Sequence, residues 1–117
     1  VFPTLESQSV DYGIMEKADD IYTLAGNFGW DDVGSWLAVG RIKENNEDGN
    51  VVNGNVVTVN TKNCVIEGAD KLIATVGLRD MIVVDTKDAT LISTKENAGE
   101  IKKVLASLRE AGKNEYL

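Results

Sequence analysis

The chain has 117 residues, a net charge of −7 and a hydrophobic fraction of 43%. This length and apolar content predict a globular domain with a real core, and the chain is short for two full domains. The scattered Lys and Arg residues argue against nucleic acid and anionic membranes as partners. No apolar run approaches the roughly 20 residues of a membrane span.

Two residue types restrict the possible chemistry. The chain has one cysteine, Cys64, and no histidine. No internal disulfide can form, which favours a reducing, cytoplasmic setting. Cys64 lies in an apolar stretch typical of a strand, so we interpret it as a small buried residue rather than a nucleophile. Without histidine, any catalysis has to use carboxylates, lysines, hydroxyls or a metal held by oxygen.

The N-terminal part of the chain predicts short elements. The chain starts at Val1 rather than at a methionine, so we expect a piece of a longer protein. Ser9 is placed to cap a short helix over residues 9–17. Residues 21–25 (Ile-Tyr-Thr-Leu-Ala) predict a short strand.

A second helix is expected to begin at Asp32 or Ser35 and to end near Lys43, because the apolar residues of this stretch recur on one side of a helix. The polar residues 44–49 end in Asp-Gly, which indicates a boundary. We therefore expect two parts, residues 1–46 and residues 47–117.

The second part predicts a ladder of short strands. β-Branched residues dominate them, as a half-buried pleated surface favours, and turn signals separate them by about eight to ten residues, which predicts a meander, a barrel or a β-solenoid. The expected strands are residues 51–52, 56–59, 64–67, 72–76, 81–84 and 90–92.

The chain ends with a predicted amphipathic helix over residues 98–111. Asn97 and Glu100 resemble a capping box, and apolar residues from Ala98 to Leu108 form one stripe. Gly112 is placed to end the helix. We expect this helix to lie across the strands.

The stretch most suggestive of chemistry is residues 29–36 (Gly-Trp-Asp-Asp-Val-Gly-Ser-Trp). Adjacent carboxylates at a loop-to-helix junction suit a hard cation such as Mg²⁺, and neighbouring residues point to opposite sides, so one of Asp31 and Asp32 should face a site while the other caps the helix. The alternative is that Asp31 is a solvated cap, Asp32 begins the helix and both tryptophans belong to the core.

A second set of candidates lies in the first predicted helix. Asp11 and Glu16 could accept hydrogen bonds from sugar hydroxyls, and Lys17 could bind a phosphate. The alternative is a charged, solvent-exposed turn, which composition alone favours.

Residues 9–17 (Ser-Val-Asp-Tyr-Gly-Ile-Met-Glu-Lys), followed by residues 29–36, resemble mannose-1-phosphate guanylyltransferases. The Gly-Asn-Val-Val pairs at the start of the ladder and the Ile-Lys-Lys-Val-Leu helix are similar to the tail of that family. The resemblance implies an α/β tail of a Rossmann-like nucleotidyltransferase domain in residues 1–46. It implies a left-handed β-helix-like ladder with a closing α-helix in residues 47–117.

The family makes GDP-mannose and pyrophosphate from GTP and mannose-1-phosphate with Mg²⁺. By its Trp-x-Asp-x-Gly motif, the resemblance implies that Asp32 is the catalytic metal ligand. It also implies that Asp11 and Glu16 lie near the sugar. We add Lys17, Gly29 and Trp30 as candidate substrate contacts.

The family's Gly-rich nucleotide loop and its first metal aspartate are missing. Its Glu-Lys-Pro sugar motif is missing too, since Glu16-Lys17 is followed by Ala18. We therefore expect a C-terminal fragment that is inactive alone. The alternatives are a non-catalytic β-solenoid that mediates oligomer contacts and another sugar-1-phosphate nucleotidyltransferase, such as a glucose-1-phosphate thymidylyltransferase. We also expect a homo-oligomer or local disorder in residues 1–46, because apolar residues of this part lack their normal packing partners.

Overall fold

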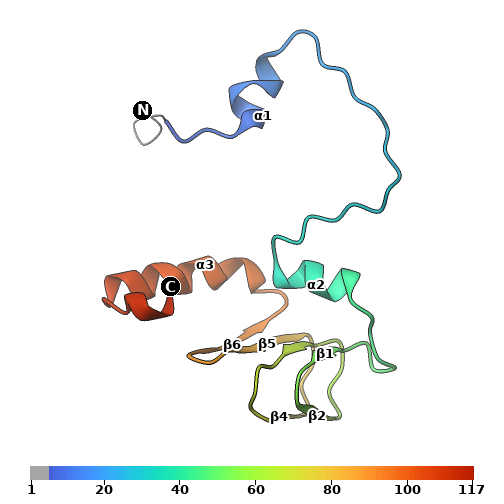
Figure 1. Ribbon diagram of the computed structural model, residues 1–117, viewed down its shortest axis with the longest axis vertical. Coiled ribbons are helices and arrows are strands. Elements are labelled where there is room, and N and C mark those ends of the chain that lie inside the picture. Colours follow the sequence, from blue (N-terminus) through green and yellow to red (C-terminus); the bar gives the residue numbers. More distant parts are fainter. Residues whose placement is uncertain (1–5) are drawn as a thin grey trace. The chain divides into compact units, whose positions relative to one another are not determined.

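The computed structural model of the chain describes residues 6–117, so Val1 and the four residues after it lie outside the description. Contacts divide the chain into two compact units, one that ends at Trp30 and one from Asp31 to Leu117. Figure 1 shows the helices and strands of both units in chain order, from blue to red. The sequence predicts a different boundary, between residues 46 and 47, which would separate the end of a catalytic domain from the ladder of strands. That boundary stays a prediction.

The first unit has little regular structure. Its helix α1 (Val10–Gly13) begins after Ser9, whose hydroxyl accepts a hydrogen bond from the Tyr12 amide at 3.4 Å, as predicted. A 3₁₀ turn, η2 (Met15–Lys17), follows. The predicted strand over residues 21–25 is wrong: this stretch is irregular, and the Leu24 side chain is 99% exposed. β-Propensity alone does not make a strand, because extended backbone needs a hydrogen-bonded neighbour.

The second unit begins with a loop and helix α2 (Trp36–Ile42). Ser35 caps this helix: its hydroxyl accepts a hydrogen bond from the Ala38 amide at 3.4 Å. Of the two predicted starts, Ser35 is therefore correct and Asp32 is wrong. The expectation that one of the paired aspartates caps the helix is also wrong, because the side-chain cap of α2 is the Ser35 hydroxyl.

Five strands form a coil in which successive turns stack in parallel. Val51 of one turn pairs with Val65 of the next, and Val65 pairs with Ile82. The second side of the coil repeats this arrangement, since Val56 pairs with Ile73. The predicted ladder is thus confirmed in its solenoid form. The strands are β1 (Val51–Asn53), β2 (Val56–Val59), β3 (Val65–Glu67), β4 (Ile73–Val76) and β5 (Met81–Asp85).

The strands β3 and β5 bury both of their faces, and β1 buries only Val51. On the outer face, a core cluster around Val65 and Ile82 is covered by Trp36 and Val39 of α2. On the inner face, Cys64, Ile66 and other residues pack inside the coil. Cys64 is fully buried, as predicted for a small core residue. Apolar residues on both faces explain why these strands show no strict alternation in sequence.

Polar side chains and a glycine close the coil at its corners. Asn50 is 1% exposed; its amide donates to the Thr61 carbonyl at 2.7 Å, and its carbonyl accepts from the Cys64 amide at 2.9 Å. At another corner, Gly54 has φ +92°, and a Cβ placed there would lie 2.4 Å from the carbonyl oxygen of Gly68. Only glycine permits this approach of two turns.

The chain leaves the coil through β6 (Thr90–Thr94), which pairs antiparallel with β5. The predicted C-terminal helix is present as a 3₁₀ turn, η3 (Ala98–Glu100), and helix α3 (Ile101–Glu110). Gly112, with φ +70°, ends it as predicted: its amide bonds to the Arg109 carbonyl, and the Lys113 amide bonds to the Leu108 carbonyl. This pair of bonds is the Schellman pattern.

Two expectations for the last helix are wrong. Asn97 makes no side-chain cap. Its backbone dihedral angles are already near the helical region, and its backbone N–H donates to the Thr94 hydroxyl. The helix also does not bury its apolar stripe across the strands. Ala98 packs against the outer core cluster, whereas Val104 is 48% exposed and Leu105 is 39% exposed. No helix among residues 6–117 is long and apolar enough to cross a membrane.

Candidate functional site

The loop before α2 is held by an ion pair with that helix. Arg41, in the last turn of α2, donates from Nε to Asp31 Oδ2 at 2.9 Å and from Nη2 to Asp31 Oδ1 at 2.7 Å. This two-point geometry fixes the plane of the carboxylate as well as its position. The hydrogen bonds from Arg41, more than its charge alone, hold the pKa of Asp31 below its usual value. Asp31 is therefore a structural partner of α2.

The neighbouring carboxylate, Asp32, has no arginine partner among the described residues. Asp32 is exposed, and it makes no hydrogen bond or ion pair with any other residue that the structure describes. A Cβ at Gly34 would lie 3.3 Å from Asp32 Oδ1, so a side chain at position 34 would crowd this carboxylate. The two adjacent acids thus differ, because one is bound by arginine and the other is open to a ligand.

A magnesium site needs several oxygen ligands. Between residues 6 and 117, no three acidic, histidine or cysteine side chains gather where they could hold a metal ion. Asp32 offers a single carboxylate, and Asp31 is occupied by Arg41. The described residues therefore do not make a magnesium site by themselves, and no chemical step through Mg²⁺ follows from them.

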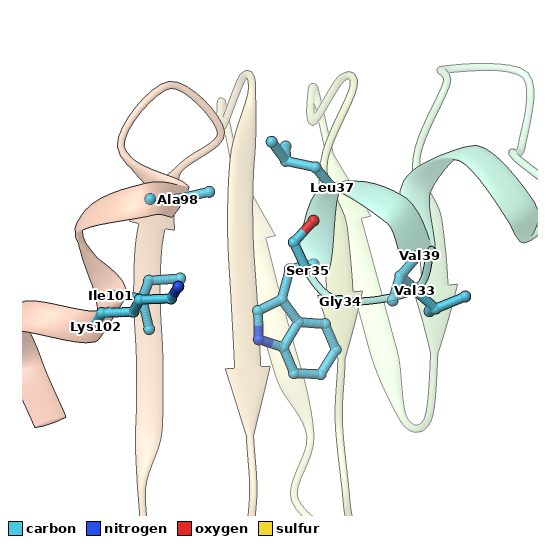
Figure 2. A pocket seen from close by; sticks show the side chains of 10 residues that line it. Val33, Gly34, Ser35, Leu37, Val39, Ala98, Ile101 and Lys102 are labelled. Atoms are coloured by element: carbon cyan, nitrogen blue, oxygen red, sulfur yellow. The ribbon is translucent and has the colours of Figure 1, made fainter. Parts of the chain in front are cut away.

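A groove runs beside this loop, between the start of α2 and the start of α3. It has a volume of about 580 Å³. Figure 2 shows Val33, Ser35 and Leu37 on one side of the groove and Ala98, Ile101 and Lys102 on the other. The lining is mostly apolar, with the Lys102 ammonium as its cationic group. Such a groove suits an apolar segment of protein better than a polyphosphate.

The other predicted site residues lie in the first unit and are exposed. Asp11 is in the first turn of α1, and Glu16 and Lys17 are in η2. Gly29 has φ +67°, and the Trp30 side chain is 75% exposed. None of these five makes a side-chain hydrogen bond or an ion pair within the described chain, so the structure does not gather them into a site.

Sequence reasoning missed Arg41. It lies ten positions after Asp31, on a helix whose predicted role was only to present an apolar side to the core. Local pairing rules on helices reach three or four positions, so no short-range pattern could have connected a loop acid with this arginine. The loop geometry that joins them becomes visible only in the folded chain.

Most of the coil and its closing helix match a known protein family. Residues 54–108 match the family model of the MannoseP isomerase/GMP-like beta-helix domain. The parallel stacking of turns agrees with this family. The handedness of the coil stays a prediction.

The whole chain has more specific relatives. It is 40% identical over 108 residues to a putative mannose-1-phosphate guanylyltransferase of Vibrio cholerae, which covers 92% of this chain and 23% of the relative. It is 35% identical to the mannose-1-phosphate guanylyltransferase of Klebsiella pneumoniae, over 99% of this chain and 25% of the relative. The chain thus spans about a quarter of the length of these curated relatives.

A solved structure agrees. The crystal structure of mannose-1-phosphate geranyltransferase from Thermus thermophilus superposes with a TM-score of 0.80 at 33% identity, over 92% of this chain and 33% of that one. The predicted resemblance is therefore confirmed. Over nearly its whole length, the chain is homologous to a C-terminal portion of mannose-1-phosphate guanylyltransferases.

Proposed function

We propose that this chain is the C-terminal portion of a cytoplasmic mannose-1-phosphate guanylyltransferase, which joins GTP and mannose-1-phosphate to give GDP-mannose and pyrophosphate. The observation that supports this most is the homology over 92–99% of the chain to enzymes of that name. Because the chain covers only about a quarter of them, the 117-residue chain alone is expected to be inactive.

Within such an enzyme, Asp32 is the residue we assign to the metal. The ion pair of Asp31 with Arg41 supports this choice, because it leaves Asp32 as the open carboxylate of the pair. Asp32 would supply one oxygen ligand to Mg²⁺, and the other ligands would come from parts of the enzyme outside this chain. Asp11, Glu16, Lys17, Gly29 and Trp30 stay candidate substrate contacts of the same enzyme.

The first test is a calorimetric titration of the 117-residue chain with GTP and Mg²⁺. We expect no specific binding, whereas the full-length enzyme should bind GTP and form GDP-mannose. Tight GTP binding or turnover by the 117-residue chain would contradict the assignment of a portion that is inactive alone.

The second test is Asp32→Asn in the full-length enzyme. We expect turnover to fall by about 100-fold or more, as when a group that stabilises transition-state charge is removed, while the circular dichroism spectrum stays the same. Asp48→Asn is the control, because Asp48 is an exposed acid in the turn after α2, where it lies 3.8 Å from Lys62 Nζ. Unchanged turnover in Asp32→Asn would remove Asp32 from the metal site.

A second candidate function is a contact module, and the groove beside α2 favours it. The groove and the exposed stripe of α3, which includes Val104 and Leu105, leave apolar surface uncovered in the second unit. The occupant could be the catalytic domain of the same enzyme or a second copy in a homo-oligomer. Light scattering of the 117-residue chain separates the two, since a monomer at millimolar concentration would exclude a second copy.

A further inference from the structure

The two sheets of the coil have different numbers of strands. One sheet has four, in the order β1-β3-β5-β6, and the other has only β2 and β4. After β5 the chain turns back as β6 instead of crossing to the second sheet. Within residues 6–117, β4 therefore has a neighbour on one edge only. Beside its other edge is a cavity of about 330 Å³, the β4 slot, lined by Ile73, Thr75, Val83, Asp85, Thr90 and Ile92.

The free edge of β4 presents unpaired backbone groups to this slot. The Ile73 amide donates to the Asn55 carbonyl at 2.9 Å, and the Gly77 amide donates to the Val59 carbonyl at 2.8 Å. Alternate residues of a parallel strand point their backbone groups to opposite neighbours, so those of Ala74 and Val76 point to the free edge. The strand has no proline or lysine that would block a further strand.

The inner face of the last hairpin is covered over only part of its width. Val83 of β5 and Ile92 of β6 are opposite each other in the register, so their side chains lie on the same face. Val83 is 5% exposed and packs inside the coil, whereas Ile92 is 64% exposed. The sheet of β2 and β4 covers Val83, but it lacks a third strand that would cover Ile92.

Asp85 lines the same slot and is 8% exposed. Its Oδ1 accepts hydrogen bonds from the Thr90 hydroxyl at 2.6 Å and from Lys71 Nζ at 3.3 Å. Its Oδ2 is buried without a partner among the described residues. A buried carboxylate oxygen without a donor is costly, and this one lies two positions along the inner face from Val83.

We propose that the β4 slot binds an extended peptide segment of a partner protein, which adds a third strand to the second sheet. A single extended peptide would meet three needs of the slot: partners for the β4 edge, cover for Ile92 and a donor for Asp85. Its amides and carbonyls pair with Ala74 and Val76, an inward apolar side chain covers Ile92, and an inward basic side chain two positions away donates to Asp85. Strand addition at a sheet edge is a general mode of peptide recognition. A helix or a small molecule offers no such row of alternating backbone groups.

The test uses the ¹⁵N-labelled 117-residue chain and the probe peptide acetyl-Thr-Val-Thr-Arg-Thr-amide. We expect saturable NMR shifts at the amides of Ala74 and Val76 and at the Ile92 methyl groups. Asp85→Asn should weaken binding about tenfold, the loss of one charge-assisted hydrogen bond. It should leave unchanged the binding of a peptide with leucine in place of arginine. Asp88→Asn is the control, since Asp88 is an exposed acid on the adjoining turn.

A second variant, Ile92→Thr, keeps the test valid if Asp85→Asn does not fold. Ile92 is exposed, so this change should leave the fold intact and weaken binding of both peptides. Absence of shifts at Ala74 and Val76 would overturn the proposal. Concentration-dependent shifts at these residues without peptide would assign the slot to a second copy and would also overturn it.

Discussion

The two units of this chain use similar residues and reach different structures. Residues 21–25 contain Ile, Tyr, Thr and Leu, and the strands of the coil draw on the same kind of residue, with Val added. In the first unit this composition gives irregular backbone with Tyr22 94% exposed, whereas in the coil it gives strands with Val65 and Ile66 fully buried. The difference between the two regions is the presence of a partner strand.

In the coil, each strand finds its neighbour a short distance along the chain. Val51 pairs with Val65, fourteen positions away, and Val56 pairs with Ile73, seventeen positions away. Such short loops lose little entropy on closure. Residues 21–25 have no comparable neighbour within the described chain. A strand-forming sequence is therefore necessary for a strand, and a nearby partner decides whether it forms.

Hydrogen exchange gives the largest expected contrast between the two regions. We expect the amides of residues 21–25 to exchange close to the rate of an unfolded peptide. Those of Ile66 and Val83 should exchange at least about 1,000-fold more slowly, because they open only with the core. The measurement is exchange followed by NMR on the 117-residue chain. Strong protection of residues 21–25 in a monomer would contradict the contrast.

The coil itself should break at Gly54. Alanine there would place a Cβ 2.4 Å from the Gly68 carbonyl oxygen at φ +92°, so we expect a loss of about 4 kcal/mol in the free energy of unfolding. Gly77→Ala is the matched control: its φ is +69°, but no atom lies within 4 Å of the added Cβ. It should cost only about 1 kcal/mol. Equal losses in urea unfolding would mean that the close approach of the two turns is unimportant.

The strands of the coil could be predicted because each is a short β-branched segment between turn residues. All six predicted strands are present within a residue or two of their expected ends. The closing helix was predicted equally well, since its apolar stripe and Gly112 are local signals. The packing of that helix could not be predicted, because an amphipathic stripe shows that a face is apolar and does not show what covers it.

The buried polar corner at Asn50 should matter nearly as much as Gly54. Asn50→Ala removes the partners of the Thr61 carbonyl and the Cys64 amide, both within the coil, so we expect a loss of about 3 kcal/mol in urea unfolding. Asn53→Ala is the control, because Asn53 is exposed and its side chain bonds only to the Glu67 side chain. It should cost less than about 1 kcal/mol. A loss as small as this for Asn50→Ala would mean that water replaces its hydrogen bonds.

The candidate site was predictable only in part. The motif at residues 29–36 predicted one acid that faces a site and one that caps the helix. The capping role is wrong, and the structure shows a different division, in which Asp31 pairs with Arg41 and Asp32 has no partner among the described residues. The reason for the division, Arg41, could not be deduced, since it depends on how the loop folds back over α2. The choice of Asp32 as the metal ligand stays a prediction, and its expected partners are not among the described residues.

The smallest expected effect tests this division directly. The hydrogen bonds from Arg41 hold the pKa of Asp31 below its usual value, so Arg41→Gln should raise it toward that value in an NMR titration of the Asp31 carboxyl carbon. Arg109→Gln, on the exposed side of α3, should leave it unchanged. If Asp31 titrates identically in the chain and in Arg41→Gln, the ion pair does not persist in solution, and Asp31 would be as open to a ligand as Asp32.

The same ion pair should make stability depend on pH in one direction. Because the folded-state pKa of Asp31 is lower than the unfolded one, the pair stabilises the fold fully above the unfolded value of about 3.9. Its contribution is lost as the pH falls through the folded value. The melting temperatures of the chain and of Arg41→Gln should therefore differ slightly at pH 7 and converge in stronger acid. Added salt should reduce the difference at pH 7, since the pair is partly exposed.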